Sequence, residues 1–103
     1  MLDAIRAIEV FVEGLDFDAF RNDRKTVDAV VRNLEVIGEA ARYVPETVRE
    51  EFEDIPWTSI IGIRSVLIHE YFGVDSEILW ETIKADLPTL TPLLESALQE
   101  GAD

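Results

Sequence analysis

The sequence predicts an all-α protein: an up-and-down bundle of four main helices with short helical turns between them. Apolar residues recur at spacings of three and four along most of the chain, which is the period of an amphipathic helix. No segment shows the apolar–polar alternation of a half-buried strand. A chain of 103 residues can bury one core. We therefore expect residues 1–103 to form a single domain, with a loose tail over residues 100–103.

The first two main helices are expected at residues 2–14 and from residue 23 to about residue 42. Apolar side chains form one stripe on the first helix, and Gly14 marks its end. On the second helix, Glu35 and Glu39 lie opposite the apolar stripe. That stripe consists of Val27, Val30, Val31, Leu34, Ile37, Gly38 and Ala41. Because Gly38 carries no side chain, it allows a neighbouring helix to approach closely.

A short helix and the last main helix are punctuated by prolines. Pro45 suits the first turn of a helix over residues 46–53, where its missing N–H costs nothing. The last helix starts near residue 75. Pro88 and Pro92 lie within its apolar pattern, so we expect them to kink or divide it.

The third main helix, over residues 60–72, is apolar in nearly every direction, so it belongs inside the bundle. Arg64, Ser65 and His69 interrupt this pattern and fall at about 0°, 100° and 140° on a helical wheel. Tyr71 returns to the side of Arg64. A single polar arc therefore carries the only histidine of the chain.

A buried arginine needs either a carboxylate partner or an opening to water. In the structural interpretation, Arg64 forms an ion pair with Glu35, Glu39 or Glu70. His69 is then a satisfied interior histidine. In the functional interpretation, the polar arc lines a cleft. The Arg-x4-His spacing on its own is a weak motif and favours the structural interpretation.

The charge of the chain limits its partners. It has 22 acidic and 9 basic residues, a formal net charge of −13. This argues against a broad basic surface for nucleic acid, and we expect no DNA binding. One explanation is a salt-rich cytoplasm that screens self-repulsion. A melting temperature that stays constant from low to molar KCl would contradict that explanation.

Two absences in the sequence bear on location. No cysteine is present, which is compatible with a reducing cytoplasm. No apolar run approaches the roughly 18 residues of a membrane span, and the first residues lack the layout of a signal peptide. We therefore expect a soluble cytoplasmic protein that does not insert in a membrane.

The polar arc suits phosphodiester chemistry without a metal or other cofactor. A di-metal bundle uses Glu-x-x-His pairs, and the residue three before His69 is Val66. An imidazole can move a proton while a guanidinium stabilises charge on a phosphate. Cleavage of RNA through its 2′-hydroxyl needs both a base and an acid, and one chain has one imidazole. A two-fold homodimer would bring two imidazoles to one cleft.

The segment from Arg64 to Tyr71 resembles the Arg-x4-His-x-Tyr signature of the HEPN superfamily. The similarity is greatest to its HepT-like branch, also known as DUF86. It covers nearly the whole chain, with matching blocks at residues 32–41, 55–57, 60–62, 79–80 and 86–88.

The resemblance implies a homodimeric, metal-independent endoribonuclease, the toxin of a toxin–antitoxin pair whose antitoxin is a minimal nucleotidyltransferase. Arg64 and His69 would be the catalytic pair, and Tyr71 the hydroxyl that the antitoxin modifies with AMP. Ser65 stands where the family usually has asparagine, and its hydroxyl can still bond a phosphate or the imidazole. The alternative is a catalytically weak or inactive dimer that serves as a binding partner of a nucleotidyltransferase.

Overall fold

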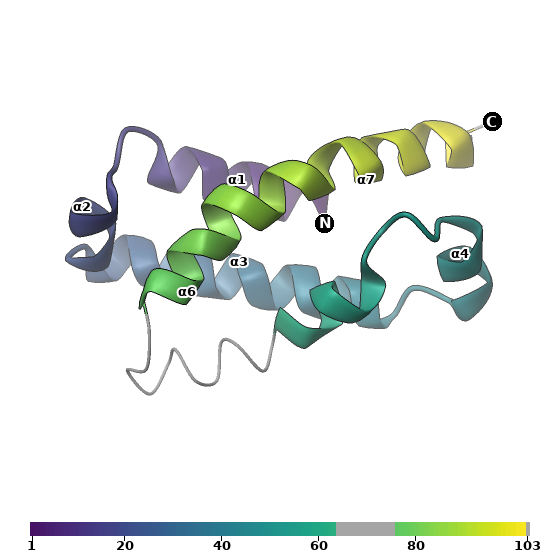
Figure 1. Ribbon diagram of the computed structural model, residues 1–103, viewed down its shortest axis with the longest axis horizontal. Helices are drawn as coiled ribbons and strands as arrows, with labels where there is room; N and C mark the ends of the chain where they lie inside the picture. Colours follow the sequence, from purple (N-terminus) through teal and green to yellow (C-terminus); the bar gives the residue numbers. More distant parts are fainter. Residues whose placement is uncertain (64–75, 103) are drawn as a thin grey trace.

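A computed structural model describes residues 1–63 and 76–102, and every regular element in these ranges is helical (Figure 1). The predicted all-α fold is confirmed. Within the described ranges, no helix has the length and apolar character to cross a membrane. In chain order the elements are α1 (Leu2–Val12), α2 (Phe17–Arg21), α3 (Arg24–Arg42), α4 (Glu46–Glu51), a helical segment over residues 57–63, α6 (Ser76–Glu81), a π-helical turn (Thr82–Asp86) and α7 (Leu87–Ala102).

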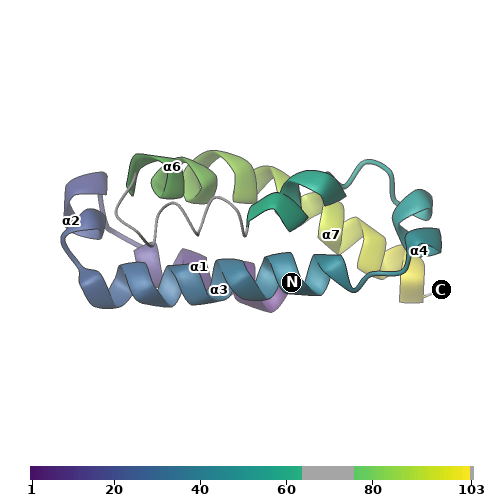
Figure 2. The same ribbon diagram turned by 90° about the horizontal axis from the view of Figure 1, so that it is seen from below.

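The long helices lie side by side along the length of the molecule. The chain runs one way in α1, returns in α3, runs back in the helical segment 57–63, and returns again in α6 and α7 (Figures 1 and 2). α1 packs mainly against α3 and also contacts α7. The short helix α2 lies at one end and α4 at the other, next to the end of α7 (Figure 2). This is the up-and-down arrangement expected from the apolar periodicity.

The core lies between α1, α3 and the last helix. Its side chains are Leu2, Ala4, Ile5, Ile8, Val12, Phe20, Val30, Leu34, Ile37, Ala41, Ile55, Ile60, Leu79, Ile83, Leu87, Leu90 and Leu94. The predicted stripe of α3 supplies several of them, and Gly38 is buried with them. Apolar positions at the edge of a stripe stay partly in water, as Phe11 at 40% and Ile78 at 43% exposure show. The spacing of apolar residues thus identifies which face of each helix is buried, but not how far around the helix the buried face extends.

The start of α3 is fixed by the side chain of Asp23. Its carboxylate accepts a hydrogen bond from the Thr26 backbone N–H at 3.3 Å and another from the Thr26 hydroxyl at 2.7 Å. These bonds favour the ionised form and lower the pKa of Asp23 below its ordinary value of 3.8. The second helix therefore begins where the sequence predicts, behind an acidic N-cap.

The last helix is interrupted ahead of its prolines rather than at them. At the π-helical turn the Leu87 N–H bonds the Thr82 carbonyl, five residues back. Pro88 then lies in the first turn of α7, where a missing N–H is tolerated, and α7 continues through Pro92. The last helix is therefore divided by a widened turn that precedes both prolines, and not at Pro88 or Pro92 as predicted. α7 also extends to Ala102, so most of the segment expected as a loose tail has helical backbone.

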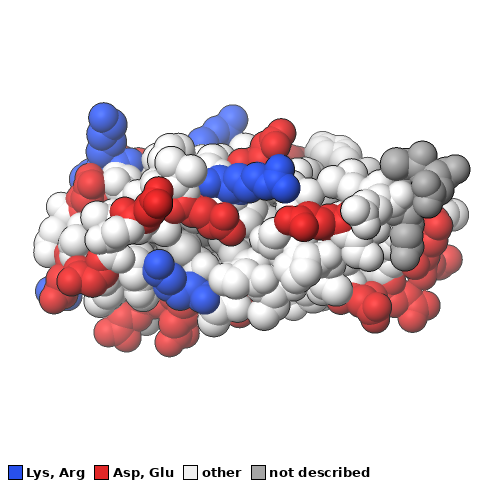
Figure 3. Space-filling model, turned by 90° about the horizontal axis from the view of Figure 1, so that it is seen from above, with Lys and Arg blue, Asp and Glu red and all other residues white. Residues whose placement is uncertain are grey.

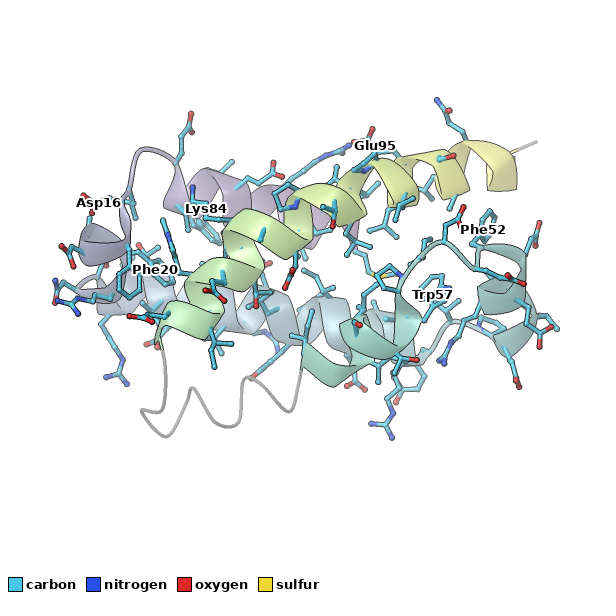
Figure 4. All side chains as sticks on the ribbon, in the orientation of Figure 1. Asp16, Phe20, Phe52, Trp57, Lys84 and Glu95 are labelled. Atoms are coloured by element: carbon cyan, nitrogen blue, oxygen red, sulfur yellow. The ribbon has the colours of Figure 1, made fainter. Side chains whose placement is uncertain are left out.

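Aromatic side chains join α6 to α2 at one end of the molecule. The Trp80 ring lies 5.0 Å from the Phe20 ring and 6.2 Å from the Phe17 ring, measured between centroids. The Lys84 ammonium lies 4.8 Å from the Trp80 ring centroid (Figure 4). This cluster anchors the beginning of the last helix.

Charged groups of both signs are interspersed on the face that α1 and α7 form (Figure 3). Arg6 and Glu95 approach to 3.7 Å there, and both side chains are more than half exposed. Such a pair contributes little to stability. Among the described residues on that face, no broad basic area forms, as the net charge predicts.

Candidate active site

The four residues of the predicted polar arc lie outside the described residues. Arg64, Ser65, His69 and Tyr71 belong to residues 64–75. The structure does place two elements that bear on them. One is the helical segment 57–63, which leads directly into Arg64. The other is α3, which carries the two proposed carboxylate partners of Arg64.

The helical segment 57–63 is held close to α3 at Gly38. A Cβ atom on Gly38 would lie 3.4 Å from the backbone oxygen of Ile60. Ile60 itself is only 3% exposed. The close approach predicted from the glycine is therefore confirmed. It also fixes the path of the chain one turn before Arg64.

The start of this segment is fixed by Trp57 and Pro56. The Trp57 indole N–H donates to the Phe52 carbonyl at 3.1 Å, and both aromatic side chains are half-buried at the α4 end of the molecule (Figure 4). The Ile60 N–H donates to the Pro56 carbonyl at 3.0 Å. The position of Trp57 and the hydrogen bond to the Pro56 carbonyl together define where the helical segment 57–63 begins.

Arg49 has a structural role that the apolar periodicity does not predict. Its guanidinium donates to the carbonyls of Val44 at 3.0 Å, Ala41 at 3.2 Å and Arg42 at 2.7 Å. The last carbonyls of a helix lack partners within the helix, and a nearby cation satisfies them. Arg49 thereby ties α4 to the end of α3. The one signal in the sequence is a basic residue within a few positions of the predicted helix end.

Glu35 and Glu39 lie along one face of α3, as predicted. The Glu35 carboxylate lies 3.7 Å from the Arg32 guanidinium, one turn earlier on the same helix. Glu39 is half-buried. Both line a shallow groove of about 680 Å³ together with Arg32, Val36, Ala40 and Tyr43. Contacts of either carboxylate with Arg64 lie outside the described residues.

The face of α3 that holds this groove also exposes apolar side chains. Val36 is 39% exposed, and Tyr43, two turns later, is 74% exposed. Ala40 lies between them, and these three residues form an apolar stripe along the groove. A stripe flanked by charges of both signs can pack against another protein surface as well as face water.

The described residues offer no obvious metal site. In residues 1–63 and 76–102, no three or more His, Cys, Asp and Glu side chains are grouped so that they could hold a metal ion.

Comparison with known proteins gives a consistent picture. The sequence model of one family, described as Ribonuclease HepT-like, matches residues 1–97. The "Probable ribonuclease HepT" of Thermococcus cleftensis is 44% identical over 88 residues, covering 85% of this chain and 80% of the relative. The "Putative RNase MJ1380" of Methanocaldococcus jannaschii is 38% identical over 95 residues, covering 92% and 87%.

A third relative, the "Putative RNase TTE0752" of Caldanaerobacter subterraneus, is 44% identical over 89 residues, covering 86% of this chain and 80% of the relative. No solved structure matches the chain. The family match over residues 1–97 includes residues 64–71 as well as the core residues.

Proposed function

Because the chain belongs to the ribonuclease HepT-like family, we propose that it is a metal-independent endoribonuclease that cuts RNA in a cleft between two copies of the chain. The family match over residues 1–97 is the observation that carries this proposal. Arg64 and His69 form the proposed catalytic pair. Ser65 adds a hydroxyl that can bond the phosphate. In support, helix 57–63 leads into these residues from a fixed position on α3.

The proposed reaction uses the 2′-hydroxyl of the RNA as nucleophile. One His69 imidazole takes the 2′-hydroxyl proton as the oxygen attacks phosphorus, and the bond from phosphorus to the 5′-oxygen breaks. The imidazole of the second copy protonates that leaving oxygen. The products are a 2′,3′-cyclic phosphate and a free 5′-hydroxyl. Arg64 stabilises the negative charge that builds up on the phosphate oxygens.

The exposed stripe on α3 supports the two-fold dimer. Val36 and Tyr43 offer apolar surface beside Arg32 and Glu39, and a second copy running in the opposite direction would set charges of opposite sign near each other. Light scattering tests this step. We expect the mass of a dimer for the wild type and a monomer for Val36→Glu. A wild-type monomer that still cleaves RNA would contradict the dimer cleft.

The proposal extends to control by a minimal nucleotidyltransferase antitoxin. That partner would transfer AMP from ATP to the Tyr71 hydroxyl and release pyrophosphate. The added adenylate places bulk and negative charge beside the cleft, which would exclude RNA. Intact mass spectrometry of the co-expressed pair should show one added AMP group on the wild type and none on Tyr71→Phe.

The central test is RNA cleavage by the purified protein in molar KCl, where salt screens the charge of −13. We expect cleavage by the wild type in the presence of a chelator, and a loss of about 100-fold or more in His69→Ala. Equal cleavage by His69→Ala would rule out the catalytic pair. No cleavage, together with stable binding of the nucleotidyltransferase, would instead identify an inactive binding partner, consistent with serine at position 65.

A further inference from the structure

A second groove lies directly before the proposed catalytic residues. It has a volume of about 470 Å³ and separates the helical segment 57–63 from the π-helical turn and the start of α7. Ser59, Ile60 and Ile63 line one side, and Thr82, Asp86 and Leu87 line the other. This volume is within the usual range for small-ligand pockets, which are mainly apolar with a few polar groups. The residue that follows Ile63 in the chain is Arg64.

The polar groups of this groove are chiefly hydrogen-bond acceptors. The Thr82 hydroxyl donates its proton to the Ile78 carbonyl at 3.0 Å, and the Thr89 hydroxyl donates to the Asp86 carbonyl at 2.7 Å. Both hydroxyl oxygens are left to accept. The Asp86 carboxylate is exposed and makes no hydrogen bond or ion pair in the part of the chain that the structure describes. The groove therefore favours a ligand whose polar edge carries donors.

An RNA base is a flat ligand of this kind. Sequence-selective proteins bind unstacked bases against apolar surfaces and read their Watson–Crick edges. Guanine carries two adjacent donors there, N1–H and the N2 amino group, which match the two oxygens of a carboxylate. Adenine, cytosine and uracil each offer one donor group on that edge. The Ser59 hydroxyl can donate to the O6 of guanine.

We propose that this groove binds a guanine base of the RNA next to the cleaved bond, and that Asp86 determines this specificity. The proposal rests on the proposed ribonuclease function and adds a sequence preference to it. Ile63 is partly exposed and provides an apolar wall for the ring, while the nearly buried Ile60 and Leu87 form the floor of the groove. The same carboxylate would repel a free phosphate group, so the groove is suited to the base rather than to the RNA backbone.

Titrations with GMP, IMP and AMP test binding separately from cleavage. The three nucleotides carry the same ribose and phosphate group and differ only in the base. Each is titrated into the uniformly nitrogen-15-labelled protein in molar KCl, and amide shifts are followed by NMR. We expect GMP to shift amides of residues 57–63 and 82–90, with binding about tenfold tighter than AMP. IMP lacks the N2 amino group and should bind with intermediate affinity.

Two variants localise the effect. Asp86→Asn replaces one acceptor by a donor and should weaken GMP binding by about 10- to 100-fold, with AMP binding little changed. Glu81→Gln removes the same charge from an exposed residue outside the groove lining and serves as the matched control. Gly62→Leu adds a side chain where a Cβ meets no atom within 4 Å, so it should fold and obstruct the groove.

Cleavage of single-stranded RNAs with one guanine at varied positions supplies the second readout. Cuts beside guanine in the wild type, and no such preference in Asp86→Asn, support the proposal. RNA cleavage without base preference overturns it and leaves the ribonuclease function intact. GMP binding in the groove without RNA cleavage supports the guanine site and removes the ribonuclease function.

Two other results also overturn the proposal. The first is equal affinity for GMP and AMP in the NMR titration. The second is the finding that another protein surface already covers the groove, either a second copy of this chain or an arginine side chain of a partner protein. Coverage would appear as concentration-dependent or partner-dependent shifts of the same amides, with no GMP response. A guanidinium also matches a carboxylate, so titration with the nucleotidyltransferase belongs in this experiment.

Discussion

α3 and the last helix are the two longest helical stretches that the structure describes, and they are built differently. α3 is a regular helix of 19 residues, capped by Asp23 at its start and by Arg49 at its end. The last helix contains a π-helical turn and keeps a proline inside α7. α3 therefore serves as the fixed support to which segment 57–63 is anchored, whereas the irregular turn lines a groove.

The buried stripe of the last helix continues through its widened turn. Leu79, Ile83 and Leu87 are all buried, and they are spaced by four residues. The regular helix α1 buries Ala4, Ile8 and Val12 at the same spacing, so the stripe does not by itself require a π-helical turn. Thr82 and Asp86 lie within the widened turn and line the groove.

The largest effect is expected for a core substitution in α3, the helix to which segment 57–63 is anchored. Ile37 has no exposed surface, so Ile37→Ala should lower the free energy of unfolding by about 2–5 kcal/mol, because it removes buried methyl groups and leaves a cavity. Ile78→Ala makes the same change in α6 at a side chain that is 43% exposed, and it should cost clearly less. Urea denaturation measures both. Equal losses would contradict the burial of Ile37 in the core.

The second prediction concerns the proline in the last helix. Pro92 lies inside α7, where proline removes a backbone hydrogen bond, so Pro92→Ala should raise the free energy of unfolding by up to about 3 kcal/mol. Pro45→Ala is the control, because Pro45 directly precedes α4 and costs no helical bond. A Pro92→Ala variant with no gain in melting temperature would mean that the surrounding packing already compensates for the proline.

The smallest effect is expected at the N-cap of α3. The lowered pKa of Asp23 means that its carboxylate stabilises the fold above its ordinary pKa of 3.8, and that this contribution is lost as pH falls through the lower pKa of the folded state. Asp23→Ala should therefore melt a few degrees below the wild type at pH 7, with the difference shrinking in acid. Asp23→Asn keeps an acceptor without titrating and should show no such pH dependence.

The site could be predicted from the sequence only as a pattern. Arg64, His69 and the flanking blocks identify the family because they lie at fixed spacings along the chain, and spacing is visible without a structure. The contacts of Arg49 and the proposed role of Asp86 could not be derived from spacing. They depend on backbone carbonyls of a neighbouring helix and on a groove between two helices, and neither is encoded by a local period.

The sequence by itself determined the helical class, the helix starts at Asp23 and Pro45, and the core face of α3, because local hydrogen bonding and the 3.6-residue period act within one helix. It also indicated the close approach at Gly38. Only the tertiary structure decided that Ile60 is the neighbour there, and that the last helix widens at Thr82–Asp86 and continues through Pro92. These outcomes depend on how whole helices pack, which is a property of several segments at once.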